Sequence, residues 1–148
     1  MSLNLSANLL VPAIALVLWS LTMLIWMVVV RFPAMKAANI NLAKAIGGRG
    51  QDLEKLLPPA ANWPAHNYAH LMEQPTIFYP TILVLAVLGQ GSTLNLVLAW
   101  AYVAIRIVHS VWQVKVNAVP VRARLFLVSS LVLVVLAVNA LRAAIAAA

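Results

Sequence analysis

One stretch of the sequence, residues 101–124, combines an apolar composition with polar side chains at helical spacing. The polar residues of its first half lie three or four positions apart: Tyr102, Arg106, His109 and Gln113. On a helix that turns about 100° per residue, all four fall within roughly 60° of one another. Guanidinium groups bind carboxylates and phosphates through paired hydrogen bonds. This face is therefore a candidate binding site for an anion.

A second set of polar residues has the same kind of spacing: His66, His70 and Glu73. On a helix these residues share a face, and two histidines four positions apart can ligate a metal ion. The neighbouring arginines would repel a dication, so the sequence predicts that no metal binds here. A metal site remains an alternative, as does a haem held by His70 and His109 on facing helices.

The composition places these residues in a membrane protein. The 148 residues are 64% hydrophobic and only 9% charged, whereas soluble domains are about one quarter charged. The sequence therefore predicts a single all-α integral membrane domain over residues 1–148. Ten basic residues against three acidic ones indicate loop orientation and an anion site, and we expect no nucleic-acid partner. Cysteine is absent, so any thiol chemistry requires a thiol brought by a ligand.

The apolar runs predict a four-helix transmembrane bundle. The expected helices cover about residues 9–31, 65–89, 94–116 and 120–144, and a polar loop covers residues 32–63. The first run lacks the basic start of a signal peptide, so we expect it to remain as a helix. Pro75 and Pro80 fall inside the second helix, where each removes a backbone hydrogen bond. We expect a kink there, with neighbouring groups satisfying the freed carbonyls.

Basic residues gather at the first and third of the three predicted junctions. They are Arg31, Lys36, Lys44, Arg49 and Lys55 at the first, and Lys115, Arg122 and Arg124 at the third. The positive-inside rule then places both junctions in the cytoplasm and both termini outside it. The expected location is the bacterial inner membrane, crossed several times by the chain.

The sequence contains two longer motifs: N-Y-x-H-L-x-E-x-P-x-I-F-Y at residues 67–79, and R-x-x-H at 106–109 followed by V-P-V-R at 119–122. Both resemble the MAPEG family, the membrane-associated proteins of eicosanoid and glutathione metabolism. The resemblance implies a homotrimer of four-helix subunits. It also implies that glutathione, as co-substrate, binds between subunits near the cytoplasmic face.

The resemblance also implies roles for individual residues. Arg122 matches the catalytic arginine that stabilises the glutathione thiolate. The implied glutathione-binding residues are Arg31, His70, Glu73, Arg106, His109 and Gln113. Several positions depart from the family pattern: His70 stands where Asn is frequent, Gln113 and Phe126 stand where Tyr is frequent, and His66 and Ala69 replace arginines.

The function expected from these features is that of a membrane-bound glutathione transferase or peroxidase. It would use glutathione or a similar anionic thiol to conjugate or reduce an apolar electrophile taken from the lipid bilayer. One alternative is a non-catalytic bundle that binds an anionic amphiphile or a partner helix, with ion pairs such as Glu73 to Arg106 locking its helices. A metal or haem protein is the third hypothesis.

Overall fold

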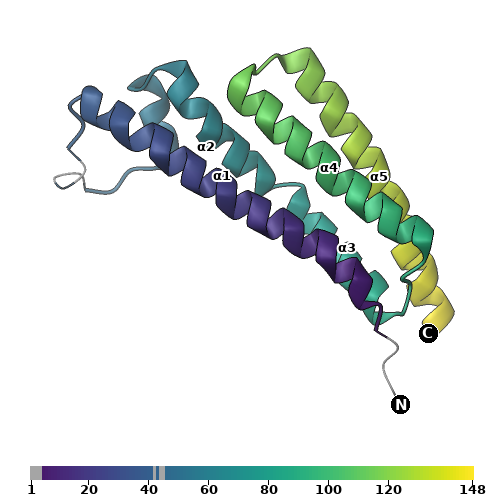
Figure 1. Cartoon of the computed structure of the whole chain (residues 1–148). Coiled ribbons are helices and arrows are strands. Elements are labelled where there is room, and N and C mark those ends of the chain that lie inside the picture. The colour runs from purple at the N-terminus through teal and green to yellow at the C-terminus, as the bar shows by residue number, and fades with distance from the viewer. Residues whose placement is uncertain (1–4, 42, 44–45) are drawn as a thin grey trace.

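The computed structural model describes residues 5–41, 43 and 46–148, and this part of the chain is helical without strands (Figure 1). Its α-helices are α1 (Leu10–Ala37), α2 (Pro59–Leu71), α3 (Pro75–Val87), α4 (Thr93–Lys115) and α5 (Val119–Ala147). Two short 3-10 helices, η1 (Ala7–Leu9) and η3 (Gly50–Lys55), precede α1 and α2. In the elongated bundle α1 packs against α2, and α4 packs against α5. The predicted all-α class is confirmed.

Three helical segments of the described chain are long and apolar enough to cross a membrane: Ala7–Ala37, Thr93–Lys115 and Val119–Ala147. The prediction of an integral membrane protein is therefore confirmed. Helices α2 and α3 have 13 residues each, so each is only about 20 Å long and too short for a hydrocarbon core of about 30 Å. The fourth span stays a prediction.

The second predicted helix, residues 65–89, differs most from the structure. The helix begins earlier, with Pro59 in its first turn, where proline is favoured. It is then interrupted at residues 72–74 before α3 begins at Pro75. If the helix continued through this point, the carbonyl of Leu71 would have no backbone donor, because Pro75 has no N–H. The expected kink is a complete break.

Smaller differences concern the ends of the other helices. Helix α1 continues beyond Arg31 to Ala37, so the first loop is shorter than predicted, and Lys44 lies outside the described residues. Helix α4 begins where the Ser92 hydroxyl accepts a hydrogen bond of 3.3 Å from the backbone N–H of Asn95. The bounds of α4 and α5 otherwise lie within a few residues of the prediction.

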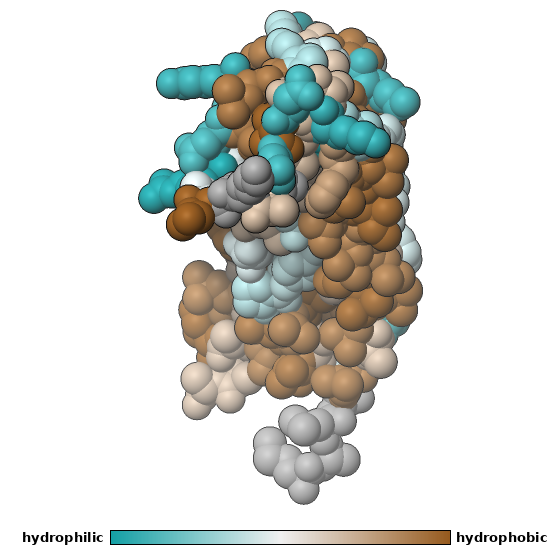
Figure 2. All heavy atoms as spheres, turned by 90° about the vertical axis from the view of Figure 1, so that its left-hand side faces the viewer, coloured by the Kyte–Doolittle hydropathy of each residue, from teal (hydrophilic) through white to brown (hydrophobic). Residues whose placement is uncertain are grey.

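Both basic junctions lie at the same end of the bundle, and the two termini lie at the other end (Figure 1). Figure 2 shows hydrophilic residues gathered at the first end, with apolar surface below them. We call this the basic end. There the ammonium of Lys115 lies over the ring of Trp26, 5.1 Å from its centroid, and connects α4 to α1.

The opposite end is held by uncharged polar contacts. The hydroxyl of Ser6 accepts a 2.8 Å hydrogen bond from the N–H of Gly91 in the α3–α4 turn. A Cβ at Gly91 would lie only 2.6 Å from that hydroxyl, so the close approach requires glycine. The Asn139 amide of α5 donates to the Asn95 side chain of α4 over 2.8 Å.

The centre of the bundle is an apolar core to which all the long helices contribute. Phe78 of α3 is 0% exposed, and its ring stacks on Tyr102 of α4 with centroids 4.4 Å apart. Such a pair contributes about 0.5–1.5 kcal/mol beyond its area. The pair connects the short helix α3 to α4, the helix that carries the polar face.

Replacing Phe78 by alanine tests this packing. Lipid tails are as apolar as the bundle interior, so the main expected cost is the cavity, at about 24 cal/mol per Å³ over about 90 Å³. The free energy of unfolding should fall by about 2 kcal/mol, measured by thermal unfolding in detergent. Ile77→Ala is the control, because Ile77 is 58% exposed on the same helix. Equal losses in the two variants would contradict the packing described here.

Candidate functional site

The polar face predicted in residues 101–124 is the buried face of α4. Its members Tyr102, Arg106, His109 and Gln113 are all buried, together with Ser110 at the edge of the stripe. The continuous 3.6-residue periodicity of α4 explains why they share one side. The opposite side carries exposed aliphatic residues such as Val108 and Val111.

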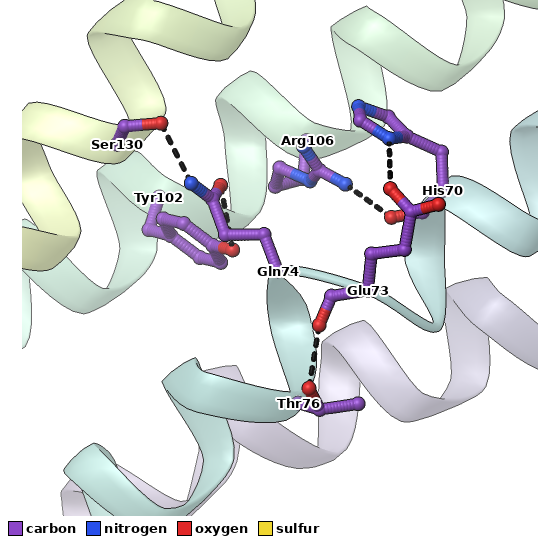
Figure 3. Close-up of polar contacts among 7 residues, drawn as sticks. All are labelled: His70, Glu73, Gln74, Thr76, Tyr102, Arg106 and Ser130. Carbon is purple, nitrogen blue, oxygen red and sulfur yellow. Dashed lines mark hydrogen bonds and ion pairs between the residues drawn. The ribbon is translucent and has the colours of Figure 1, made fainter.

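Arg106 is the most deeply buried charged group among the described residues, at 0% exposed. Its Nη2 donates a 3.0 Å hydrogen bond to the backbone carbonyl of His70 (Figure 3). Its Nε and Nη1 are buried and have no hydrogen-bond partner in the described chain. No carboxylate in this part of the protein forms an ion pair with Arg106. A buried guanidinium with open donors favours an anion nearby.

Glu73 forms its contact with His70 rather than with Arg106. Oε2 of Glu73 lies 2.9 Å from Nδ1 of His70, and the Glu73 side chain is 68% exposed (Figure 3). The Glu73–Arg106 ion pair considered as a structural lock is therefore not formed. Glu73 instead holds the imidazole of His70 in one orientation and keeps its other oxygen accessible.

The ring of His70 lies between α4 and α5. Its centroid is 5.1 Å from that of His109 and 5.3 Å from that of Phe126. Half-buried Arg122, in the first turn of α5, donates from Nη1 to the Asn117 side chain over 2.6 Å. Its Nε is buried without a partner among the described residues. Arg122 is close enough to act electrostatically on both histidines.

The break between α2 and α3 is connected to the other helices through Gln74. Its side-chain oxygen accepts a 3.3 Å hydrogen bond from the Tyr102 hydroxyl of α4. Its side-chain nitrogen donates over 2.6 Å to the Ser130 hydroxyl of α5 (Figure 3). One residue of the break is therefore hydrogen-bonded to both helices of the α4–α5 pair.

Arg31 and His66 lie apart from this set, at the junction of α1, η3 and α2. The Arg31 guanidinium donates a 3.0 Å hydrogen bond to the Asn62 side chain, and His66 Nε2 lies 2.9 Å from Glu54 Oε1. Arg31, His66, Glu54 and Gly50 line a cleft of about 300 Å³. The described chain has no hydrogen bond between this cleft and the polar face of α4.

The three residues predicted to share a face on the second helix thus divide between two places. His66 turns toward Glu54, whereas His70 and Glu73 contact each other. The described residues contain no group of three metal-ligating side chains. The rings of His70 and His109 lie directly against each other, so no porphyrin fits between them.

Sequence reasoning missed two polar residues on the inner side of the second helical segment, Asn67 and Gln74. Asn67 is fully buried, and both its side-chain polar atoms lack a partner within the described chain. The seven-residue spacing of Asn67 and Gln74, with His70 between them, was the available signal, because residues seven apart lie on one helix face. The break at residues 72–74 turns Glu73 outward from this face.

The geometry therefore supports two kinds of chemistry. Arg106 and Arg122 can stabilise an anion, since few carboxylates lie near them to compensate their charge. The Glu73–His70 pair can exchange a proton, because a carboxylate on one ring nitrogen fixes the tautomer and orientation of imidazole. Phe126 adds an apolar wall beside these groups.

Comparison with known proteins gives one result. The family model described as the MAPEG family matches residues 9–142. No curated protein and no solved structure gives a significant match to this chain.

The bridge formed by the hydrogen bonds of Gln74 to Tyr102 and Ser130 can be tested by Gln74→Met. This substitution keeps the side-chain volume and removes both hydrogen bonds. Interhelical hydrogen bonds in membranes contribute about 0.6 kcal/mol on average, and stranding the buried Tyr102 hydroxyl adds to the cost. We expect the free energy of unfolding in detergent to fall by about 1–2 kcal/mol. Gln90→Met is the control, because Gln90 is exposed and, within the described chain, its side chain bonds only the nearby Leu88 carbonyl. A loss as large in the control would contradict the bridge.

Proposed function

Because this chain belongs to the MAPEG family, we propose that it is a membrane-bound glutathione-transferase-like protein. It binds glutathione, or a similar anionic thiol, at the basic end of the bundle. It then conjugates or reduces an apolar electrophile that arrives from the lipid bilayer. Glutathione is a co-substrate, and no metal takes part in the reaction we propose.

The observation that carries this proposal is the charge of Arg106. A fully buried guanidinium is costly when only part of its hydrogen-bonding capacity is used. An anion bound beside it lowers that cost. Arg106, His109 and Gln113 are too deeply buried to form the rim of the site, so we assign them to its wall. Within this wall, the charge of Arg106 keeps the potential positive where the anion binds.

Arg122 is the accessible cation of the site, because it is only half-buried in the first turn of α5. A neighbouring cation lowers the pKa of a thiol and so raises the fraction of the nucleophilic thiolate. We assign to Arg122 the stabilisation of that thiolate. The apolar surface around Phe126 supports the binding of an apolar electrophile next to the sulfur.

The remaining binding residues match the polar ends of glutathione. Glutathione carries two carboxylates and one ammonium group. The largely exposed carboxylate of Glu73 can meet the ammonium while it holds His70. Arg31 can bind a carboxylate, since its guanidinium lines a cleft and its Nε has no partner in the described chain.

We further propose a homotrimer with one site at each subunit boundary. Glu73 is open to the outside of the single chain, which is consistent with a neighbouring subunit completing the site. The broad apolar faces of α1 and α5 can pack against other copies as well as against lipid. Native mass measurement in detergent should give three chains per particle, and a monomer at working concentration would contradict the proposal.

The topology we propose has four spans in the bacterial inner membrane, with α2 and α3 together forming the fourth. Both basic junctions lie at one end of the bundle, which supports placing that end in the cytoplasm and both termini outside. An alkaline phosphatase fused after Ala148 should therefore be active in intact cells, because that enzyme folds only outside the cytoplasm. Activity of a cytoplasmic reporter at the same position would refute the topology.

Calorimetry with glutathione in detergent is the decisive test of the function, and saturable heat is the expected result. Arg122→Ala should then lower turnover by about two to three orders of magnitude, the usual effect of losing one preorganised charge. Its effect on glutathione affinity should be smaller, since Arg122 acts mainly on the thiolate. Glu73→Gln should instead weaken binding by roughly 1.5–3 kcal/mol, the contribution of one charged hydrogen bond.

The same variants distinguish the non-catalytic alternative, in which the polar residues only hold the bundle together. That alternative is favoured by the hydrogen bond between Arg106 and the His70 carbonyl, which is a structural contact. It predicts no heat with glutathione at millimolar concentration and lower melting temperatures for both variants. Near-native melting, with a loss of turnover in Arg122→Ala and a loss of affinity in Glu73→Gln, supports the enzyme.

A further inference from the structure

His70 is fixed in position by contacts from three elements. Its Nδ1 is hydrogen-bonded to Glu73, which follows α2, over 2.9 Å. Its ring lies against His109 of α4 at 5.1 Å and against Phe126 of α5 at 5.3 Å between centroids. Figure 3 shows the imidazole and the Glu73 carboxylate turned toward each other. An imidazole held in this way can direct its other nitrogen, Nε2, at one point.

The hydrogen bonding leaves Nε2 as the acceptor. When Nδ1 donates its proton to a carboxylate, the neutral ring has its lone pair on Nε2. Arg106 does not occupy that nitrogen, because it bonds the backbone carbonyl of His70. The side chain is also partly accessible, with 22% of its surface exposed. The geometry is therefore that of a carboxylate-oriented base at the edge of a positively charged site.

We propose that His70 is the proton acceptor for the bound thiol and that Glu73 is its positioning residue. This inference rests on the proposed function, which supplies the thiol. In the step, the S–H bond breaks, its electron pair stays on sulfur, and the proton forms an N–H bond at Nε2 of His70. When the thiolate attacks an electrophilic carbon, the same proton is available to the atom that receives the displaced electron pair. No oxidant or further reactant is needed.

The charges that face His70 suit this exchange. Arg106 from α4 and Arg122 from α5 disfavour a further positive charge at His70, which favours the neutral ring before the thiol binds. Glu73 stabilises the protonated ring, and the new thiolate adds a second negative charge beside it. Arg122 then stabilises the sulfur, and His70 keeps the proton within the site. With Arg122 alone, ionisation of the thiol would release the proton to water. With His70 as the acceptor, the proton stays in the site.

The test measures where the proton goes when glutathione binds to the full chain in detergent. Titrations near neutral pH, in two buffers with different protonation enthalpies, give the number of protons released, and ultraviolet absorbance gives the thiolate formed. We expect far fewer than one proton released per thiolate in the wild-type protein. One full proton released per thiolate would overturn the inference and leave the proposed function intact. Absence of saturable heat would overturn both.

Variants provide the second readout. His70→Asn preserves the backbone carbonyl that Arg106 bonds, so we expect it to fold. It should release about one proton for each thiolate formed and lose about 100-fold or more in turnover, within the usual range for a general base. Its turnover should rise with pH as the free thiol ionises, whereas the wild-type rate reaches a plateau earlier. Unchanged proton release and an unchanged pH profile would overturn the inference.

His66→Asn is the matched control, since it removes an equally short histidine–glutamate contact, 2.9 Å to Glu54, in the other cleft. Its proton count per thiolate should equal that of the wild type, whatever its affinity. A change as large as that of His70→Asn would show that any histidine near the basic end buffers the proton, and would contradict a specific role for His70. S-methylglutathione, which has no thiol proton, should give the same proton count with all three proteins.

Discussion

The hydrogen bond from Arg106 to the carbonyl of His70 is the interaction on which the arrangement of the bundle depends. A helix that stops inside a membrane leaves carbonyl groups without donors, and water is not available there to replace them. Pro75 favours such a stop because it has no N–H to donate to the carbonyl of Leu71. The guanidinium of Arg106 reaches across from α4 and bonds the preceding carbonyl, that of His70, at 3.0 Å. The break and the buried charge therefore stabilise each other.

This pairing also explains how the candidate site is assembled. With the break fixed against α4, His70 is held beside His109, and Gln74 reaches both Tyr102 and Ser130. Glu73, at the turn, is directed outward but remains in contact with His70. In a continuous helix, His70, Glu73 and Gln74 would follow one another at the regular angular spacing of helical residues. The interruption places an oriented imidazole and an accessible carboxylate at the same point.

The sequence predicted the α4 part of the site well, because one uninterrupted helix with one buried face has a simple period. Spacing alone identifies Arg106, His109 and Gln113. The second helix was predicted less well. The first part of this helix, from Pro59, contains Asn62 and Asn67, and asparagine is typical of loops. Their burial depends on the packing between helices, to which Asn62 adds a bond with Arg31, and a single segment does not encode such contacts.

The division of residues 59–87 into two short helices, α2 and α3, has one more consequence, which concerns peptide dipoles. The carboxyl end of α2, where His70 lies, carries a partial negative charge from its unpaired carbonyl groups. Arg106 points at that end, so part of its charge is balanced by the backbone. Peptide groups do not titrate, whereas a carboxylate partner would be neutralised in acid. The contact that secures the buried arginine therefore does not depend on the ionisation of a carboxylate partner.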